Sequence, residues 1–169
     1  MCKQLGLIYN FISYTIQLFK YNSTLDHNNF KCSCFVDFCY TEEINKSNRY
    51  CETSPQYPCA PGKSYYGRGP IQLTGNINYG KAGNDLKLNL LNNPEMVASD
   101  PVVSFKTALW YWMVAVRPVV SQGFGATIKA INGAVECGGK EPQRVQRRIG
   151  FYTDYCKQLG VDPGANLSC

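Results

Sequence analysis

Amide and hydroxyl side chains are concentrated beside aromatic rings in residues 65–80, YYGRGPIQLTGNINYG. The polar residues of this run are Arg68, Gln72, Thr74, Asn76 and Asn78. Several of them alternate, so a strand or turn would point them to one side. Glycines let a ligand approach the backbone, and tyrosines offer flat faces with polar tips. This chemistry suits a sugar, which has hydroxyls at its edge and C–H groups on its face, although an ordinary loop has a similar composition.

The whole chain has the length and composition of one folded domain. It has 169 residues, of which 44% are hydrophobic and 17% are charged, so a disordered chain is excluded. The net charge is +5, and the basic residues are scattered apart from Arg144, Arg147 and Arg148. The helical spacing of that cluster predicts a solvated helix face rather than a nucleic-acid site.

The nine cysteines favour an oxidising compartment. Cys51 and Cys59 flank a short step that a disulfide would close easily, and Cys137 and Cys169 would tie the C-terminal segment to the turn at residues 131–133. The remaining cysteines are odd in number, so at least one is unpaired or pairs elsewhere: Cys2, Cys32, Cys34, Cys39 and Cys156. Sequons at Asn22, Asn45 and Asn166 are compatible with secretion.

Metal and cofactor chemistry has no support in the sequence. No Cys-x-x-Cys pair occurs, and Cys32 and Cys34 are too close together for the usual zinc spacing. His27 is the only histidine, which argues against a histidine metal centre or a catalytic triad. No metal or cofactor is predicted.

The clearest predicted helix begins at Asp100-Pro101, a capping residue followed by a proline at the first helical position. It runs to about Val116, where Arg117-Pro118 stops it, and its Trp110 and Trp112 are predicted to pack in the core.

The other predicted elements are weaker. Glu141-Pro142 begins a helix that ends at Gly160, a short helix covers residues 126–130 before the Asn132-Gly133 turn, and residues 84–98 form a loop plus a short helix. The apolar residues 5–19 are too short to span a bilayer and only faintly suggest a signal peptide, so no membrane association is predicted.

From Phe38 to Cys169 the sequence resembles the plant glycoside hydrolase family 19, the class IV-like chitinases. Besides residues 65–80, the resemblance lies in FCYTEEIN, QYPCAPGK, DPVVSFKTALWYWM, GFGATIKAINGAVEC and QLGVDPGANLSC, in family order. It implies a mainly α, lysozyme-like bilobal fold with an incomplete N-terminal lobe. It also implies inverting endo-hydrolysis of the β-1,4 links of chitin, for cell-wall catabolism and plant defence. By family, the protein would be an extracellular or vacuolar monomer that binds N-acetylglucosamine oligosaccharides.

The resemblance assigns roles residue by residue. Glu43 matches the general base, and Thr74 matches a serine whose hydroxyl holds the attacking water. Glu42, as its neighbour, would leave a helix on another face. The residues implied to contact the sugar are Tyr57, Gln72, Asn78, Lys106, Asn132 and Arg148. From the residues alone, Glu43 and Lys106 also fit a solvated surface, and Arg148 also fits a structural ion pair.

One departure concerns the general acid, the glutamate of a His-Glu-Thr motif a few residues before FCY in the family. Cys34 occupies that position, no His-Glu-Thr occurs in the chain, and Asp37 is out of register. Residues 1–37 are therefore predicted to be a non-family segment and residues 38–169 a partial catalytic domain. Hydrolysis is predicted to be impaired, since general acid catalysis supplies about 10²–10⁴-fold. A non-catalytic chitin-binding protein and a truncated or mis-spliced gene product are the alternatives.

Overall fold

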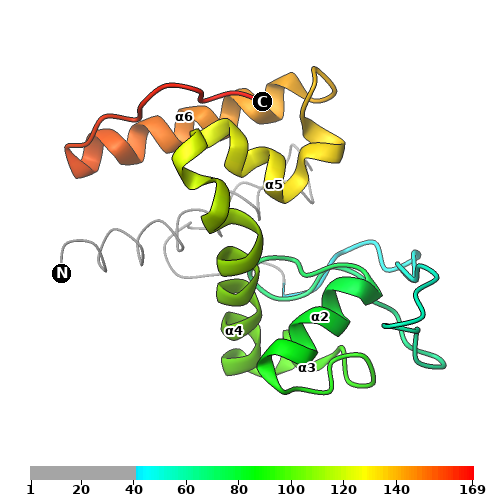
Figure 1. Ribbon diagram of the computed structural model, residues 1–169. Helices are drawn as coiled ribbons and strands as arrows, with labels where there is room; N and C mark the ends of the chain where they lie inside the picture. Colours follow the sequence, from blue (N-terminus) through cyan, green and yellow to red (C-terminus); the bar gives the residue numbers. More distant parts are fainter. Residues whose placement is uncertain (1–40) are drawn as a thin grey trace. The chain divides into compact units, whose positions relative to one another are not determined.

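The computed structural model describes residues 41–169, which form two compact units divided after Tyr111. Figure 1 shows that the regular elements are helices. In chain order they are α2 (Asn76–Leu86), α3 (Met96–Ser99), α4 (Pro101–Tyr111), the π-helix η1 (Trp112–Val116), the 3₁₀-helix η2 (Arg117–Gln122), α5 (Phe124–Glu136) and α6 (Pro142–Leu159). The predicted mainly α class is confirmed. The predictions for residues 1–37 and for Cys2, Cys32, Cys34 and Cys39 lie outside the described residues.

The core of the first unit forms where α4 packs against α2 and α3 (Figure 1). Tyr65 and Tyr79 meet edge to face with ring centroids 5.4 Å apart, an arrangement that aromatic rings prefer. The other fully or nearly buried side chains around them include Leu73, Ala82, Leu90, Val97, Ala108 and Trp110. Residues 41–75 contain no helix. They pack against the helices through core side chains such as Tyr65 and Leu73.

Helix α2 differs from the expectation of a strand or turn for the alternating polar residues of 65–80, and no helix was predicted at its position. It starts at Asn76, after Gly75 at φ 85°, and it is capped at its C-terminal end by Lys87 in the left-handed conformation. Its mixed polar sequence lacks a strong apolar period, so packing of Tyr79 and Ala82 in the core stabilises it more than local propensity does.

The predicted start of α4 is confirmed by its capping contacts. The Asp100 carboxylate accepts hydrogen bonds from the backbone N–H groups of Val102 and Val103 at 2.8 and 3.1 Å. The predicted end is wrong in part, because the chain passes from α-helix to π-helix at Trp112 and to 3₁₀-helix at Arg117. Pro118, which has no N–H, explains why an α-helix does not continue there. Trp110 and Trp112 are buried, as predicted.

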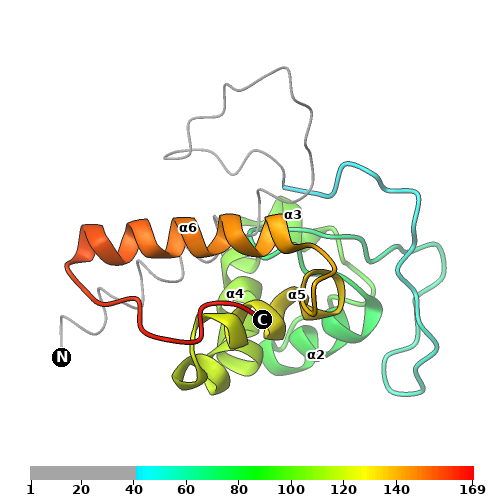
Figure 2. The same ribbon diagram turned by 90° about the horizontal axis from the view of Figure 1, so that it is seen from above.

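The second unit is built on the contact between α5 and α6. Phe124 of α5 and Tyr152 of α6 stack in parallel with ring centroids 4.1 Å apart. Helix α6 ends at Gly160, as predicted, and the tail drawn in red then runs back beside the helix (Figure 2). Gly125 must be glycine, because a Cβ atom there would lie 1.9 Å from the Ser168 carbonyl oxygen of this tail.

The predicted short helix at residues 126–130 is part of a longer helix, α5, that spans Phe124–Glu136. The expected turn survives as a kink, since Asn132 has the non-helical angles φ −141° and ψ 26°. Cys156 on α6 is a free, buried thiol. Within residues 41–169, no helix is both long enough and apolar enough to cross a bilayer.

Both predicted disulfides, Cys51–Cys59 and Cys137–Cys169, are present. The first closes a separation of 8 residues and the second a separation of 32. A cross-link stabilises mainly by restricting the unfolded chain, and more so for a longer loop.

We therefore expect the double change Cys137→Ser with Cys169→Ser to lower the free energy of unfolding by about 4 kcal/mol. Cys51→Ser with Cys59→Ser is the matched comparison and should cost about 2–3 kcal/mol, because its loop is shorter. Urea unfolding followed by circular dichroism measures both. A larger loss for the shorter loop would contradict the loop-entropy explanation.

Candidate active site

The Glu43 carboxylate is held by two hydrogen bonds in the first unit. The Tyr50 hydroxyl donates to Oε1 at 2.6 Å, and the Gly67 backbone N–H donates to Oε2 at 3.0 Å. The Glu43 backbone N–H in turn donates to the Gly67 carbonyl oxygen at 2.7 Å. Glu43 therefore sits on non-helical backbone paired with residue 67, not on a helix as the sequence analysis assumed.

Gly67 also brings Gln72 and Thr74 to this carboxylate. A Cβ atom on Gly67 would lie 2.9 Å from Gln72 Oε1 and 3.3 Å from Thr74 Oγ1, so any larger residue would push these groups away. Because both sets of contacts share Gly67, standard backbone dimensions place the Glu43 carboxylate within about 9 Å of the Thr74 hydroxyl.

The amides of this group are held by short-range hydrogen bonds. Gln72 has a left-handed backbone at φ 53° and donates from Nε2 to the Gly69 carbonyl oxygen at 3.0 Å. Thr74 donates to the Gln72 carbonyl oxygen at 2.7 Å, and Asn78 donates to the Thr74 carbonyl oxygen at 2.8 Å. These bonds fix the side chains and leave lone pairs on Gln72 Oε1 and Thr74 Oγ1 for a water or a sugar hydroxyl.

The neighbouring Glu42 has a different environment. It forms ion pairs with Lys46 and with Arg68, whose Nε lies 3.1 Å from Oε1. The Lys46 ammonium, with a further contribution from Arg68, holds the pKa of Glu42 below its usual value. Arg68 is itself buried and lies over the Tyr66 ring, 3.7 Å from its centroid. Glu42 is therefore a paired carboxylate that stays ionised near neutral pH.

Tyr50 is a site residue that the sequence analysis missed. Its backbone is left-handed at φ 48°, and its N–H donates to the Asn48 side chain at 2.9 Å. A non-glycine residue in this conformation costs energy and is common beside functional groups. The only local signals are the Asn48 turn and the adjacent Cys51, and neither indicates that the ring reaches Glu43.

Tyr50 provides a direct test of this contact. Its hydrogen bond to the Glu43 carboxylate raises the pKa of Tyr50 to about 12. In Glu43→Gln, which removes the negative charge, we expect the Tyr50 pKa to fall toward the ordinary value of about 10. Carbon NMR of labelled tyrosine Cζ measures this, and Glu52→Gln, an exposed carboxylate elsewhere in the first unit, is the matched control. An unchanged Tyr50 pKa in Glu43→Gln would contradict the contact.

In the second unit, Asn132 and Arg148 meet at a buried carboxylate, Glu136. Arg148 donates from Nε to Oε2 and from a terminal nitrogen to Oε1, both at 2.6 Å, and Asn132 donates to Oε1 at 2.6 Å. Glu136 is 1% exposed and Arg148 is 4% exposed, so the predicted solvated face is wrong for Arg148. The ion pair with Glu136 offsets the cost of burying the Arg148 guanidinium away from water.

Burial opposes ionisation of Glu136, but the hydrogen bonds from Arg148 and Asn132 outweigh it and lower the pKa of Glu136. Sequence reasoning missed Glu136. The turn expected at Asn132-Gly133 gave no sign that Glu136 would accept a hydrogen bond from Asn132.

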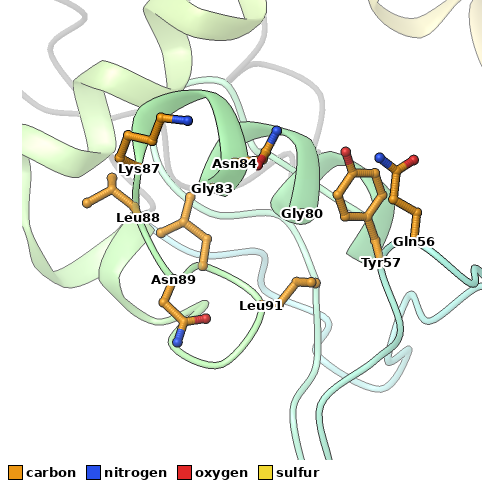
Figure 3. A pocket seen from close by; sticks show the side chains of 10 residues that line it. Gln56, Tyr57, Gly80, Gly83, Asn84, Lys87, Leu88, Asn89 and Leu91 are labelled. Atoms are coloured by element: carbon orange, nitrogen blue, oxygen red, sulfur yellow. The ribbon is translucent and has the colours of Figure 1, made fainter.

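The remaining predicted residues lie elsewhere. Lys106 is exposed on α4. The Tyr57 ring lies against Gly80 of α2, where a Cβ atom would be 2.3 Å from Cδ1 (Figure 3). Successive residues turn by about 100° around a helix, so Asn78 leaves α2 on nearly the opposite side from Gly80. The structure thus groups Glu43, Gln72, Thr74 and Asn78, while the Tyr57 ring packs against Gly80. Among residues 41–169, no three His, Cys, Asp or Glu side chains could hold a metal ion.

A helical, disulfide-closed fold with a hydrogen-bonded carboxylate among amides is consistent with the glycoside hydrolases. The sequence model of family 19, described as "Chitinase class I", matches residues 27–122 and 117–169. The chain belongs to glycoside hydrolase family 19. The match starts at residue 27, ahead of the Phe38 boundary in the sequence analysis, and that boundary stays a prediction.

Individual relatives agree with this assignment. Endochitinase EP3 of Arabidopsis thaliana is 63% identical over 134 residues, covering 78% of this chain and 49% of the relative. Endochitinase A of Zea mays is 59% identical over 133 residues, covering 78% of this chain and 48% of the relative. This chain therefore spans about half the length of the curated relatives it matches.

Solved structures give the same fold. A family 19, class IV chitinase from Zea mays superposes with a TM-score of 0.78 at 47% identity, covering 94% of this chain and 72% of the other. Chitinase C from Streptomyces griseus gives a TM-score of 0.70 at 46% identity, covering 77% of this chain and 68% of the other. The lysozyme-like chitinase fold expected from the sequence is confirmed.

Proposed function

We propose that this chain binds chitin oligosaccharides and carries the base half of an inverting endochitinase site. The observation that carries the proposal is the Glu43 carboxylate, fixed by Tyr50 and Gly67 beside the hydroxyl of Thr74. An inverting glycosidase needs a carboxylate that activates a water on the face of the sugar opposite the leaving group. Glu43 is the general base, and Thr74 holds the water.

Substrate binding is assigned to the amides near the base and to the second-unit network. Gln72 and Asn78 bond the sugar through the lone pairs and N–H groups that their turn contacts leave open. The resemblance also assigns sugar contacts to Lys106 and Tyr57 of the first unit and, within the second unit, to Asn132 and Arg148, which meet at Glu136.

The proton-donating half of the reaction is weak in this chain. Inversion requires a carboxylic acid roughly 6.5–9.5 Å from the base to protonate the leaving oxygen. Cys34 stands where the family has that acid. A thiol with a pKa near 8.5 is a poor substitute. Hydrolysis is therefore slow, and a non-catalytic chitin-binding protein is the second candidate because Cys34 favours it.

The biological assignment follows from the family. The proposed role is breakdown of chitin and cell-wall polymers in plant defence, by a secreted or vacuolar monomer that binds neither nucleic acid nor membrane. The net charge of +5 is small, and most basic residues are scattered, which supports the absence of a nucleic-acid site.

The product anomer tests the chemistry. On prolonged incubation with N-acetylglucosamine hexamer, we expect the residual product to appear first as the α-anomer, because inversion converts a β link to α. Glu43→Gln should remove this activity, and Glu52→Gln should keep it. Proton NMR of the anomeric signals makes the measurement. An initial β-anomer, or full activity in Glu43→Gln, would overturn the role of Glu43.

A further inference from the structure

The chain contains three Asn-x-Ser/Thr sequons that the proposed function does not use, and they begin at Asn22, Asn45 and Asn166. Such a triplet is the acceptor motif for N-linked glycosylation, provided that its middle residue is not proline. A glycan is bulky and hydrophilic, so the asparagine must also lie on the surface of the fold. Asn22 lies outside the described residues, and the structure therefore compares Asn45 with Asn166.

The second sequon lies in an exposed loop whose two ends are fixed to the first unit. Residues 44–49 are all exposed. Before the loop, the Glu43 backbone N–H donates to the Gly67 carbonyl oxygen at 2.7 Å. At its end, the Arg49 carbonyl oxygen accepts from the Tyr65 backbone N–H at 2.8 Å. The loop is thus held from outside the sequon, and a group attached within it displaces neither bond.

The acceptor nitrogen of Asn45 is accessible. Asn45 Oδ1 accepts a hydrogen bond from the Ser47 backbone N–H at 3.1 Å, which forms a turn within the sequon. Within residues 41–169, Asn45 Nδ2 has no hydrogen-bond partner. The turn holds together the asparagine and the serine that the motif requires, and it leaves the reacting nitrogen exposed.

The middle residue of the sequon, Lys46, is bound to the protein surface. Its ammonium pairs with Glu42 and lies over the Tyr66 ring, 5.2 Å from the centroid. A glycan on Asn45 breaks neither contact, because neither involves the Asn45 side chain.

The Asn166 side chain is exposed but takes part in the packing of the C-terminal tail. Its Nδ2 donates a long hydrogen bond to the Gln122 carbonyl oxygen at 3.5 Å, and its Cβ atom would lie 2.7 Å from a Cβ atom on Gly123. The Asn166 carbonyl oxygen also accepts from the Gly125 backbone N–H at 2.8 Å. A glycan on this nitrogen would press against the start of α5, so Asn166 is the poorer acceptor.

We propose that Asn45 is a site of N-linked glycosylation and that Asn166 is not. The co-reactant is a lipid-pyrophosphate-linked oligosaccharide. Asn45 Nδ2 forms a bond to the anomeric carbon of the first sugar, and the bond from that carbon to the pyrophosphate oxygen breaks. The nitrogen gives up one proton, and the lipid pyrophosphate leaves. The secretory location rests on the proposed function, whereas the acceptor itself rests on the loop at residues 44–49.

The glycan would lie close to the candidate active site. Asn45 follows Glu43 by two residues, so their Cα atoms are at most about 7.6 Å apart. The bonds that hold the Glu43 carboxylate come from Tyr50 and Gly67, outside the sequon. The modification therefore adds a hydrophilic group beside the site without removing a contact of the base.

Translation of the full chain behind a cleavable secretory leader, in the presence of microsomes, tests the proposal. All chains carry Asn22→Gln, which removes the sequon outside the described residues. The microsomes supply the donor and the transferase, so the result does not depend on where a cell sends the protein. Only chains protected from added protease are scored, because these have entered the lumen. We expect a gel-mobility shift that endoglycosidase reverses, and peptide mass spectrometry should place the glycan on Asn45.

Matched variants separate the acceptor from its surroundings. Asn45→Gln should lose the glycan, and Ser47→Ala should lose it although Asn45 is still present. Ser47→Thr keeps the motif and should keep the glycan. Asn166→Gln removes the other described sequon and should leave the mobility shift unchanged.

The outcomes are separate from those for the proposed function. A protected chain without a glycan overturns the proposal, and so does a glycan that survives both Asn45→Gln and Ser47→Ala. A glycan on Asn166 overturns the distinction between the two sequons. Glycan attachment requires no chitin binding, so each of these results leaves the product-anomer test of Glu43 standing.

Discussion

Replacing residues 1–37 by the intact N-terminal lobe of a family relative is expected to raise hydrolysis of N-acetylglucosamine oligomers by at least about a hundredfold. The physical reason is the restored general acid, since proton transfer to the leaving group supplies about 10²–10⁴-fold. The base and its supporting contacts are already present at Glu43. Release of reducing ends measures the rate, and the product should be the α-anomer.

Two further variants serve as controls for this chimera. Glu43→Gln in the chimera should abolish the regained activity, because the water then has no base. Cys34→Glu in the unmodified chain should restore only part of it, because the flanking His and Thr of the family motif are absent. Family-level activity in the unmodified chain would contradict the missing-acid argument. Asp37 would then be the first candidate donor, because the low pKa of Glu42 keeps that carboxylate deprotonated.

Glu136→Gln is expected to lower the free energy of unfolding by about 3–5 kcal/mol, the usual cost of removing one partner of a buried ion pair. The change leaves the Arg148 guanidinium buried without its counter-charge and loosens Asn132. Urea unfolding measures the loss. The matched control is Glu136→Leu with Arg148→Met, which removes both charges and should recover most of the stability. A loss below about 1 kcal/mol in Glu136→Gln would contradict a strongly coupled pair.

The same pair predicts acid sensitivity of the parent chain. Because the pKa of Glu136 is lower in the folded state than in the unfolded state, its contribution to stability is present above the unfolded value and is lost as pH falls through the folded one. Glu136→Gln should lack this part of the acid-induced loss.

Local sequence signals predicted the elements whose ends are set by neighbouring residues. Asp100 and Pro101 define the start of α4, and Pro142 and Gly160 define α6, because caps and breakers act within one turn. Both disulfides were likewise readable from spacing. Helix α2 was missed because its stability comes from packing Tyr79 and Ala82 in the core, which no local pattern reports.

In the candidate site, too, the sequence predicted features set by neighbouring residues and missed those that depend on folding. The alternating Gln72 and Thr74 were recognised from the sequence, but Tyr50 and Glu136 act on residues that only folding brings to them. Tyr57 was assigned as a sugar contact by likeness, but the sequence gave no sign that its ring packs against Gly80 of α2. Arg148 shows that a basic cluster with helical spacing can still turn one member inward.

The buried thiol of Cys156 also affects how this protein must be made. In the unfolded chain it competes for oxidation with Cys137 and Cys169, and a mixed disulfide would keep α6 from packing. During oxidative refolding, α6 must therefore fold and bury Cys156 faster than an oxidant or another cysteine reacts with its thiol. Slow oxidation under initially reducing conditions is therefore expected to favour the native pairing.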